Sequence, residues 1–115
     1  DVLYRLRFVP LKHGFRERYD YDNILYNVMG AVVAKVSGKR WDEFIRERFF
    51  TPLGMNASLT SVTLLKASDD AAMPHAMSDG VLKELEHSPL DSVAPAGSLV
   101  SSAVDMTRWV ITLLN

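Results

Sequence analysis

The sequence predicts a mainly α-helical fold that contains one small β-hairpin. Apolar residues recur at three- and four-residue spacing over residues 23–37, 40–50 and 103–114, which indicates three amphipathic helices. Asp79-Gly80 is a two-residue turn signal between two short runs, 74–77 and 81–85, which indicates the hairpin strands. The 115 residues amount to one domain, long enough to bury a core.

Composition narrows the functional classes. Hydrophobic residues make up 48% and charged residues 23%, an ordinary globular balance. The formal charge is −1 without a basic run, which argues against a nucleic-acid partner. The absence of cysteine excludes disulfides and thiolate chemistry. No apolar stretch reaches the roughly 20 residues of a membrane span. The chain lacks an initiator Met and stops as its last predicted helix ends, so we expect a segment cut at both ends from a longer protein.

The first strong helix, 23–37, follows a polar, aromatic turn. We expect Asp20 or Asp22 to cap its N-terminus, and Gly38 to end it in the left-handed conformation. β-Branched residues are mediocre helix formers, so this helix should depend on burial of its apolar stripe. The stripe consists of Ile24, Leu25, Val28, Val32, Val33 and Val36. A short helix is also expected before Pro10, which interrupts any longer one.

The remaining segments carry local signals of varying strength. In the helix 40–50, Asp42 and Arg46 form an attractive pair at four-residue spacing, and Thr51-Pro52 stops the helix. Residues 62–65 suit either a short strand or a helical turn, and 94–98 read as a tight loop of small residues. Before the last helix, Ser102 and Asp105 have the spacing of a capping box.

Four sequence blocks occur in an order that resembles a known family. They are Tyr21-Asp22-Asn23, Val36-Ser37-Gly38-Lys39, Pro52-Leu53-Gly54-Met55, and Ala94-Pro95-Ala96-Gly97-Ser98 followed by Asp105-Met106 and Trp109. This series is similar to the helical lobe of the serine β-lactamase (class C), penicillin-binding protein and β-lactamase-related esterase family. The resemblance covers roughly residues 15–115. It implies that the chain is a single helical lobe, over 1–115, of an α/β fold of the β-lactamase/transpeptidase type.

The resemblance also implies roles for individual residues. Tyr21 matches the general base or proton relay, and Asn23 matches a residue that orients the substrate. Gly97 and Ser98 match the substrate-binding loop, although many family members have a second glycine where Ser98 stands. A tyrosine is a weak base at neutral pH unless nearby cations lower its pKa. Asp22 places a carboxylate beside the site, which disfavours anionic substrates such as penicillins.

Two further elements of that family are missing from the sequence. No Ser-x-x-Lys occurs, and the nearest string, Thr63-Leu64-Leu65-Lys66, lacks the serine and lies at the wrong place in the order. No Lys-Thr-Gly or His-x-Gly occurs either. We therefore expect the chain to be inactive alone and to need the remaining α/β lobe of its parent, which would hydrolyse a small-molecule or peptide ester, amide or β-lactam. The uncovered cleft face should favour self-association.

Several alternatives remain open from the sequence. Asn23 suits a second role, in which it only satisfies backbone donors at a helix start. The parent is alternatively a non-catalytic binding or scaffolding relative, or the chain is an unrelated small helical interaction domain with chance matches. His13, His75 and His87 are scattered, so neither a metal site nor a cofactor is expected. The resemblance favours a bacterial source and a periplasmic, cell-envelope or secreted location.

Overall fold

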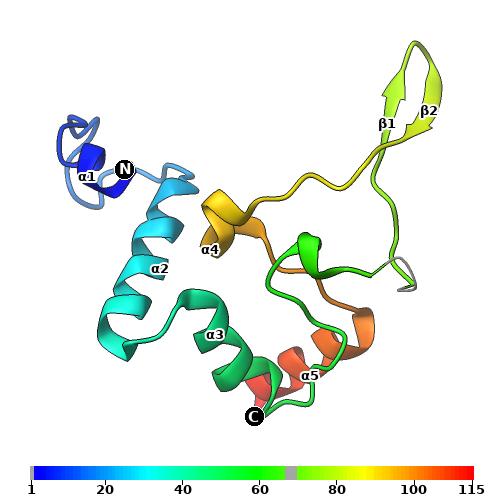
Figure 1. Cartoon of the computed structure of the whole chain (residues 1–115). Helices are drawn as coiled ribbons and strands as arrows, with labels where there is room; N and C mark the ends of the chain where they lie inside the picture. Colours follow the sequence, from blue (N-terminus) through cyan, green and yellow to red (C-terminus); the bar gives the residue numbers. More distant parts are fainter. Residues whose placement is uncertain (1, 67–69) are drawn as a thin grey trace.

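A computed structural model describes residues 2–66 and 70–115. The helices are α1 (Val2–Leu6), α2 (Ile24–Ser37), α3 (Trp41–Ile45), α4 (Ala94–Gly97) and α5 (Ala103–Leu114), with short helical turns η1 (Arg46–Phe50), η2 (Val62–Leu64) and η3 (Asp91–Val93). The strands are β1 (His75–Ser78) and β2 (Val81–Glu84). The predicted mainly helical fold with one hairpin is therefore confirmed for this part of the chain (Figure 1).

Helix α2 has the capping pattern that the sequence predicts. The Asp22 carboxylate accepts hydrogen bonds from the backbone N–H groups of Ile24 and Leu25, at 2.7 and 3.3 Å, so Asp22 rather than Asp20 caps the helix. At the other end Gly38 adopts a positive φ of 68°, and its N–H bonds to the Ala34 carbonyl. Glycine takes this left-handed conformation without steric cost, which explains why the helix stops there.

The predicted helix 40–50 has the expected extent but two different geometries. Residues of α3 are α-helical, whereas η1 is a π-helical turn in which Thr51 N–H bonds back to the Arg46 carbonyl at 2.9 Å. The expected pair of Asp42 and Arg46 forms at 3.9 Å. The π-helical turn places the Phe49 ring edge-on to Trp109 of α5, at a centroid distance of 5.5 Å. This contact packs η1 against α5.

The hairpin forms at the predicted turn and projects away from the helices (Figure 1). Asp79 and Gly80 both have positive φ, 53° and 77°, as a type I′ turn requires. The strands pair antiparallel with Met77 opposite Leu82. Strand β1 is shifted by one residue from the predicted range 74–77, and β2 ends one residue before the predicted range 81–85 does. Residues 62–64 form a 3₁₀ turn, which settles the open choice there.

The prediction of a loop at 94–98 is wrong, because residues Ala94–Gly97 form the short helix α4. Pro95 lies near the start of this helix, where its fixed φ and missing N–H are tolerated. Its ring packs directly on Gly30, the buried residue of α2: a Cβ on Gly30 would overlap Pro95 Cγ and lie 3.0 Å from Pro95 Cβ. Glycine at this position therefore permits the close approach of α2 and α4 that Figure 1 shows.

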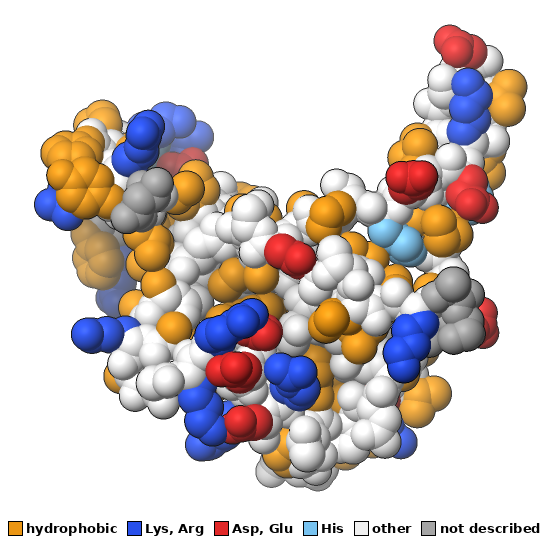
Figure 2. Space-filling model, in the orientation of Figure 1, with side chains coloured by type: hydrophobic (Ala, Val, Ile, Leu, Met, Phe, Trp, Pro, Cys, Tyr) orange, Lys and Arg blue, Asp and Glu red, His pale blue; other side chains and the backbone are white. Residues whose placement is uncertain are grey.

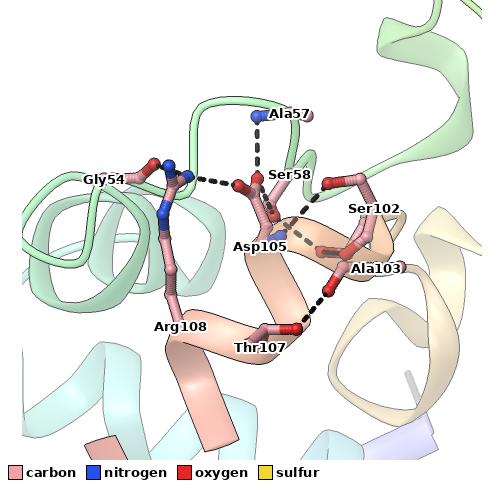
Figure 3. A network of polar contacts seen from close by, with 9 residues as sticks. Gly54, Ala57, Ser58, Ser102, Ala103, Asp105, Thr107 and Arg108 are labelled. Carbon is pink, nitrogen blue, oxygen red and sulfur yellow. Dashed lines mark hydrogen bonds and ion pairs between the residues drawn. The ribbon is translucent and has the colours of Figure 1, made fainter. Parts of the chain in front are cut away.

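A buried carboxylate connects α5 to the loop after η1 (Figure 3). Asp105 is 2% exposed, and its Oδ2 accepts hydrogen bonds from Ala57 N–H and Ser58 Oγ, both at 2.8 Å. Its Oδ1 lies 2.7 Å from the Arg108 guanidinium, which also donates to the Gly54 carbonyl. The capping-box prediction is half correct: the Ser102 hydroxyl accepts from Asp105 N–H at 3.2 Å, but the Asp105 carboxylate bonds to this distant loop.

The apolar core of the described residues is small. Phe50 and Met55, at 8% and 5% exposure, are its buried hydrophobic side chains. The accessible surface is 9428 Å², against about 6,300 Å² for a compact monomer of this mass. The Cα radius of gyration is 17.3 Å, against about 13 Å for a compact domain of this length. Figure 2 shows apolar side chains in several patches of the visible face, including the α1 segment.

The expectation that the α2 stripe is buried is wrong for the described residues. Ile24, Leu25, Val32 and Val36 are exposed, and only Val28 and Val33 are partly covered. The physical reason is that α4 covers the Gly30 side of α2, while α1 leaves an open groove along the other side.

Replacing Asp105 with alanine tests the buried carboxylate. Asp105→Ala leaves the Ala57 N–H and the buried Ser58 hydroxyl without their carboxylate acceptor and removes the ion pair with Arg108. The free energy of unfolding should therefore fall by about 3 kcal/mol. Urea denaturation followed by circular dichroism measures this change. The matched control is Asp70→Ala, at an exposed aspartate outside these contacts, which should change stability by less than about 0.5 kcal/mol. Equal urea midpoints for the two variants would contradict a structural role for Asp105.

Replacing Gly30 with alanine tests the contact of α2 with α4. Alanine favours a helix by about 1 kcal/mol over glycine, yet the overlap with Pro95 should make Gly30→Ala destabilising by about 2 kcal/mol. The double variant Gly30→Ala/Pro95→Ala removes the overlapping ring and should recover most of the loss. Additive effects of the two substitutions in a double-mutant cycle would show that the two residues do not interact.

Candidate functional site

Tyr21 lies in the turn before α2 and presents its ring to solvent. Its side chain is 73% exposed. Within residues 2–66 and 70–115, no hydrogen bond, ion pair or ring contact engages its phenol. The phenol is therefore available to a group outside the described residues.

Asn23 stands directly before α2 but does not cap it with its side chain. Its backbone carbonyl accepts the first helical hydrogen bond, from Tyr26 N–H at 3.2 Å. The Asp22 carboxylate satisfies the free N–H groups that follow, so the alternative in which Asn23 serves only those donors is wrong. The exposed Asn23 amide keeps its donors and acceptor for another partner.

Gly97 and Ser98 lie at the end of α4, and the two residues differ in environment. Gly97 is exposed, and an added Cβ would meet only Leu90 Cδ1, at 3.5 Å. Ser98 is buried, with its hydroxyl 2.6 Å from the Thr60 carbonyl and 3.1 Å from the Ala94 carbonyl. The Ser98 hydroxyl thus holds α4 against the Thr60 segment, and substrate binding by Gly97 and Ser98 stays a prediction.

The contact of α4 with α2 brings two of the sequence blocks to one region. Asn23 and Gly30 are two helical turns apart, about 10 Å along the axis, and they lie within one quarter of the helix circumference. Pro95 packs on Gly30, so the 94–98 block is held on the side of α2 that carries Asn23. Figure 1 shows α4 beside the first turns of α2.

Asn27 is a polar residue on this side of α2 that sequence reasoning missed. It lies one turn after Asn23, and residues four apart share a helix face. Its Oδ1 is enclosed, yet no hydrogen-bond partner for it exists among the described residues. A buried polar atom without a partner is uncommon in folded proteins. The available signal was an asparagine within the mostly apolar first two turns of the helix.

Other candidate groups form no site in the described part of the chain. No set of three His, Asp or Glu side chains lies close enough to hold a metal ion there. Thr63 of the Thr63-Leu64-Leu65-Lys66 string lies in η2, where its hydroxyl contacts Ser61 Oγ at 2.7 Å. None of the described helices is both long enough and apolar enough to cross a bilayer.

Comparison with known proteins gives a family for these residues. The Beta-lactamase family model matches residues 1–115, the whole chain. Unguisins hydrolase ungD′ of Aspergillus campestris is 26% identical over 100% of this chain and 22% of its own length. Gigasin-6 of Magallana gigas is 25% identical over 99% of this chain and 39% of its own length. Protein flp of Staphylococcus aureus is 24% identical over 100% of this chain and 23% of its own length.

The chain thus spans between about a fifth and two fifths of the length of these relatives. They come from Aspergillus, Magallana and Staphylococcus, so the comparisons do not single out a bacterial source. The interpretation as an unrelated helical domain with chance matches is wrong, because the family model covers every residue. The four sequence blocks and the full-length match agree, and the chain belongs to the Beta-lactamase family.

Proposed function

We propose that these residues are part of a serine hydrolase that cleaves an ester, amide or β-lactam through an acyl-serine intermediate. Tyr21 acts as general base or proton relay, and Asn23 orients the substrate. The observation that carries the proposal is that the three residues before α2 differ in their contacts: the Asp22 carboxylate caps the helix, whereas the side chains of Tyr21 and Asn23 do not. The phenol of Tyr21 and the amide of Asn23 are exposed, with no side-chain hydrogen bond to another of the described residues.

The proposed reaction needs a serine and a lysine from another part of the parent. The serine hydroxyl attacks the carbonyl carbon, and the Tyr21 phenolic oxygen takes its proton and passes it to the leaving alcohol or amine. Water then cleaves the acyl-serine ester, which releases the acid and regenerates the serine. The lysine ammonium favours the phenolate that accepts the proton. An asparagine amide suits contact with a substrate amide or carbonyl, since it both donates and accepts.

Two comparisons support hydrolysis over a purely structural role. The relatives from Aspergillus campestris and Aspergillus violaceofuscus both bear the name unguisins hydrolase. Each of them is about five times longer than the matched segment, which leaves room for the serine and lysine elsewhere in a parent of that kind. A location in the periplasm, cell envelope or extracellular space is part of the same proposal and rests on the family alone.

We also propose that the remaining α/β lobe of the parent covers the open apolar surface. The accessible area of 9428 Å² exceeds that of a compact monomer by about 3,000 Å². A stable protein interface needs only about 800 Å² from each partner. The uncovered α2 stripe lies beside the site residues, so the same lobe would cover the stripe and bring the nucleophile to Tyr21. Without that lobe, two copies of this chain would associate through the same surface.

Active-site labelling separates the isolated chain from its parent. We expect the 115-residue chain to form no adduct with a fluorophosphonate or a labelled penicillin, because no Ser-x-x-Lys occurs in it. The parent should gain one fluorophosphonate per molecule, measured by intact mass spectrometry. A stoichiometric adduct on the isolated chain would contradict our account, and an unlabelled parent would favour a non-catalytic binding relative.

Substitution of Tyr21 in the parent tests its proton-transfer role. Tyr21→Phe removes the phenolic oxygen and keeps the ring, so kcat should fall by about 10²- to 10⁴-fold. The matched control is Tyr19→Phe, at an exposed tyrosine two residues away, which should change kcat by less than twofold. Steady-state hydrolysis of a p-nitrophenyl ester gives both values. Equal kcat values for the two variants would remove Tyr21 from the mechanism.

A further inference from the structure

The carboxylate of Asp22 is held between the two proposed site residues. Its Oδ1 accepts hydrogen bonds from Ile24 N–H and Leu25 N–H, at 2.7 and 3.3 Å. Aspartate is among the preferred residues for such a cap, and a carboxylate at the N-terminus of a helix interacts favourably with the helix dipole. The negative charge therefore stays at the start of α2, one peptide unit from Tyr21 on one side and from Asn23 on the other.

No basic side chain neutralises this charge within the part of the chain that the structure describes. The nearby basic side chains of Arg18 and His13 contact Asp20 instead, at 4.0 and 3.7 Å. The ion pairs of the described residues do not include Asp22. Side chains on adjacent residues lie within about 10 Å of one another, which is one Debye length at 0.1 M salt, so a group bound by Tyr21 and Asn23 experiences the charge.

We propose that Asp22 makes the site select against acyl donors that carry a carboxylate near the scissile carbonyl, and in favour of neutral or cationic ones. This inference rests on the proposed function, because it assumes that Tyr21 and Asn23 contact the substrate. The repulsion acts on an anionic substrate in both its ground state and its transition state, so kcat/KM is the affected quantity. For a solvent-exposed pair of like charges at this range, the expected discrimination is about three- to tenfold.

The experiment compares two esters in the intact parent. One is p-nitrophenyl butyrate, which is neutral, and the other is the mono-p-nitrophenyl ester of succinic acid, which is anionic and has an acyl chain of equal length. Asp22→Asn removes the charge and keeps the size and the helix cap, since asparagine caps as well as aspartate. We expect kcat/KM for the anionic ester to rise about three- to tenfold and that for the neutral ester to change less than twofold.

A second aspartate at a helix start provides the matched control. Asp42 lies in the first turn of α3 and is paired with Arg40 at 3.0 Å, away from the site residues. Asp42→Asn changes the net charge of the protein by the same amount and should leave the ratio of the two kcat/KM values unchanged. In the wild-type protein, raising the salt concentration to about 0.5 M should narrow the preference for the neutral ester, because salt screens exposed charges.

The outcomes distinguish this inference from the function on which it rests. If the parent hydrolyses both esters and Asp22→Asn leaves their ratio unchanged, the inference is overturned and the proposed function stands. If Asp22→Asn lowers both rates equally, the residue does not discriminate between substrates by their charge, and the inference is again overturned. If the parent hydrolyses neither ester and forms no fluorophosphonate adduct, the proposed function fails and the inference fails with it.

Discussion

The buried carboxylate of Asp105 is the interaction on which the rest of the packing depends. It accepts from Ala57 and Ser58 and pairs with Arg108, and Arg108 in turn donates to the Gly54 carbonyl. These bonds fix the loop after η1 against the start of α5. Because the described residues bury few apolar side chains, this hydrogen-bonded carboxylate is one of the main contacts that join the two segments.

At the start of α2, as at Asp105, one carboxylate accepts more than one hydrogen bond. A helix N-terminus leaves free N–H groups that need an acceptor, and one carboxylate satisfies two of them. If Asn23 were the cap, its amide would be committed to the backbone and could not meet a substrate. Because Asp22 caps the helix, the Asn23 amide is not committed to the backbone. Asp22 thus has a structural role, whereas the side chains of Tyr21 and Asn23 remain available to a ligand.

Local chemistry explains which features the sequence could predict. The bounds of α2 follow from Asp22 and Gly38, and the hairpin turn follows from Asp79-Gly80, because each depends on residues a few positions away. The partners of Asp105 could not be predicted, since Ala57 is 48 positions distant in the chain. Helix α4 was missed for a related reason: its small residues suggest a loop, and its packing on Gly30 of α2, 65 positions from Pro95 in the chain, is not visible in the local sequence. For the site, Tyr21 and Asn23 could be named from the motif and its resemblance. The absence of a side-chain cap bond at Asn23 and the enclosed Oδ1 of Asn27 could be seen only in the three-dimensional structure.

The position of Tyr21 and Asn23 at the edge of packed structure has a mechanistic consequence. On one side of α2, Pro95 of α4 packs on Gly30, which fixes the helix that carries the site. On the other side the apolar stripe is open, so the element that covers it would also set the distance from its own side chains to Tyr21. A proton relay needs its two oxygen atoms within hydrogen-bond reach, and that distance is better controlled by an apolar interface than by a mobile loop. Under the proposed function, burial of the stripe and assembly of the reacting groups would be a single event, and catalysis would depend on the two lobes being packed together.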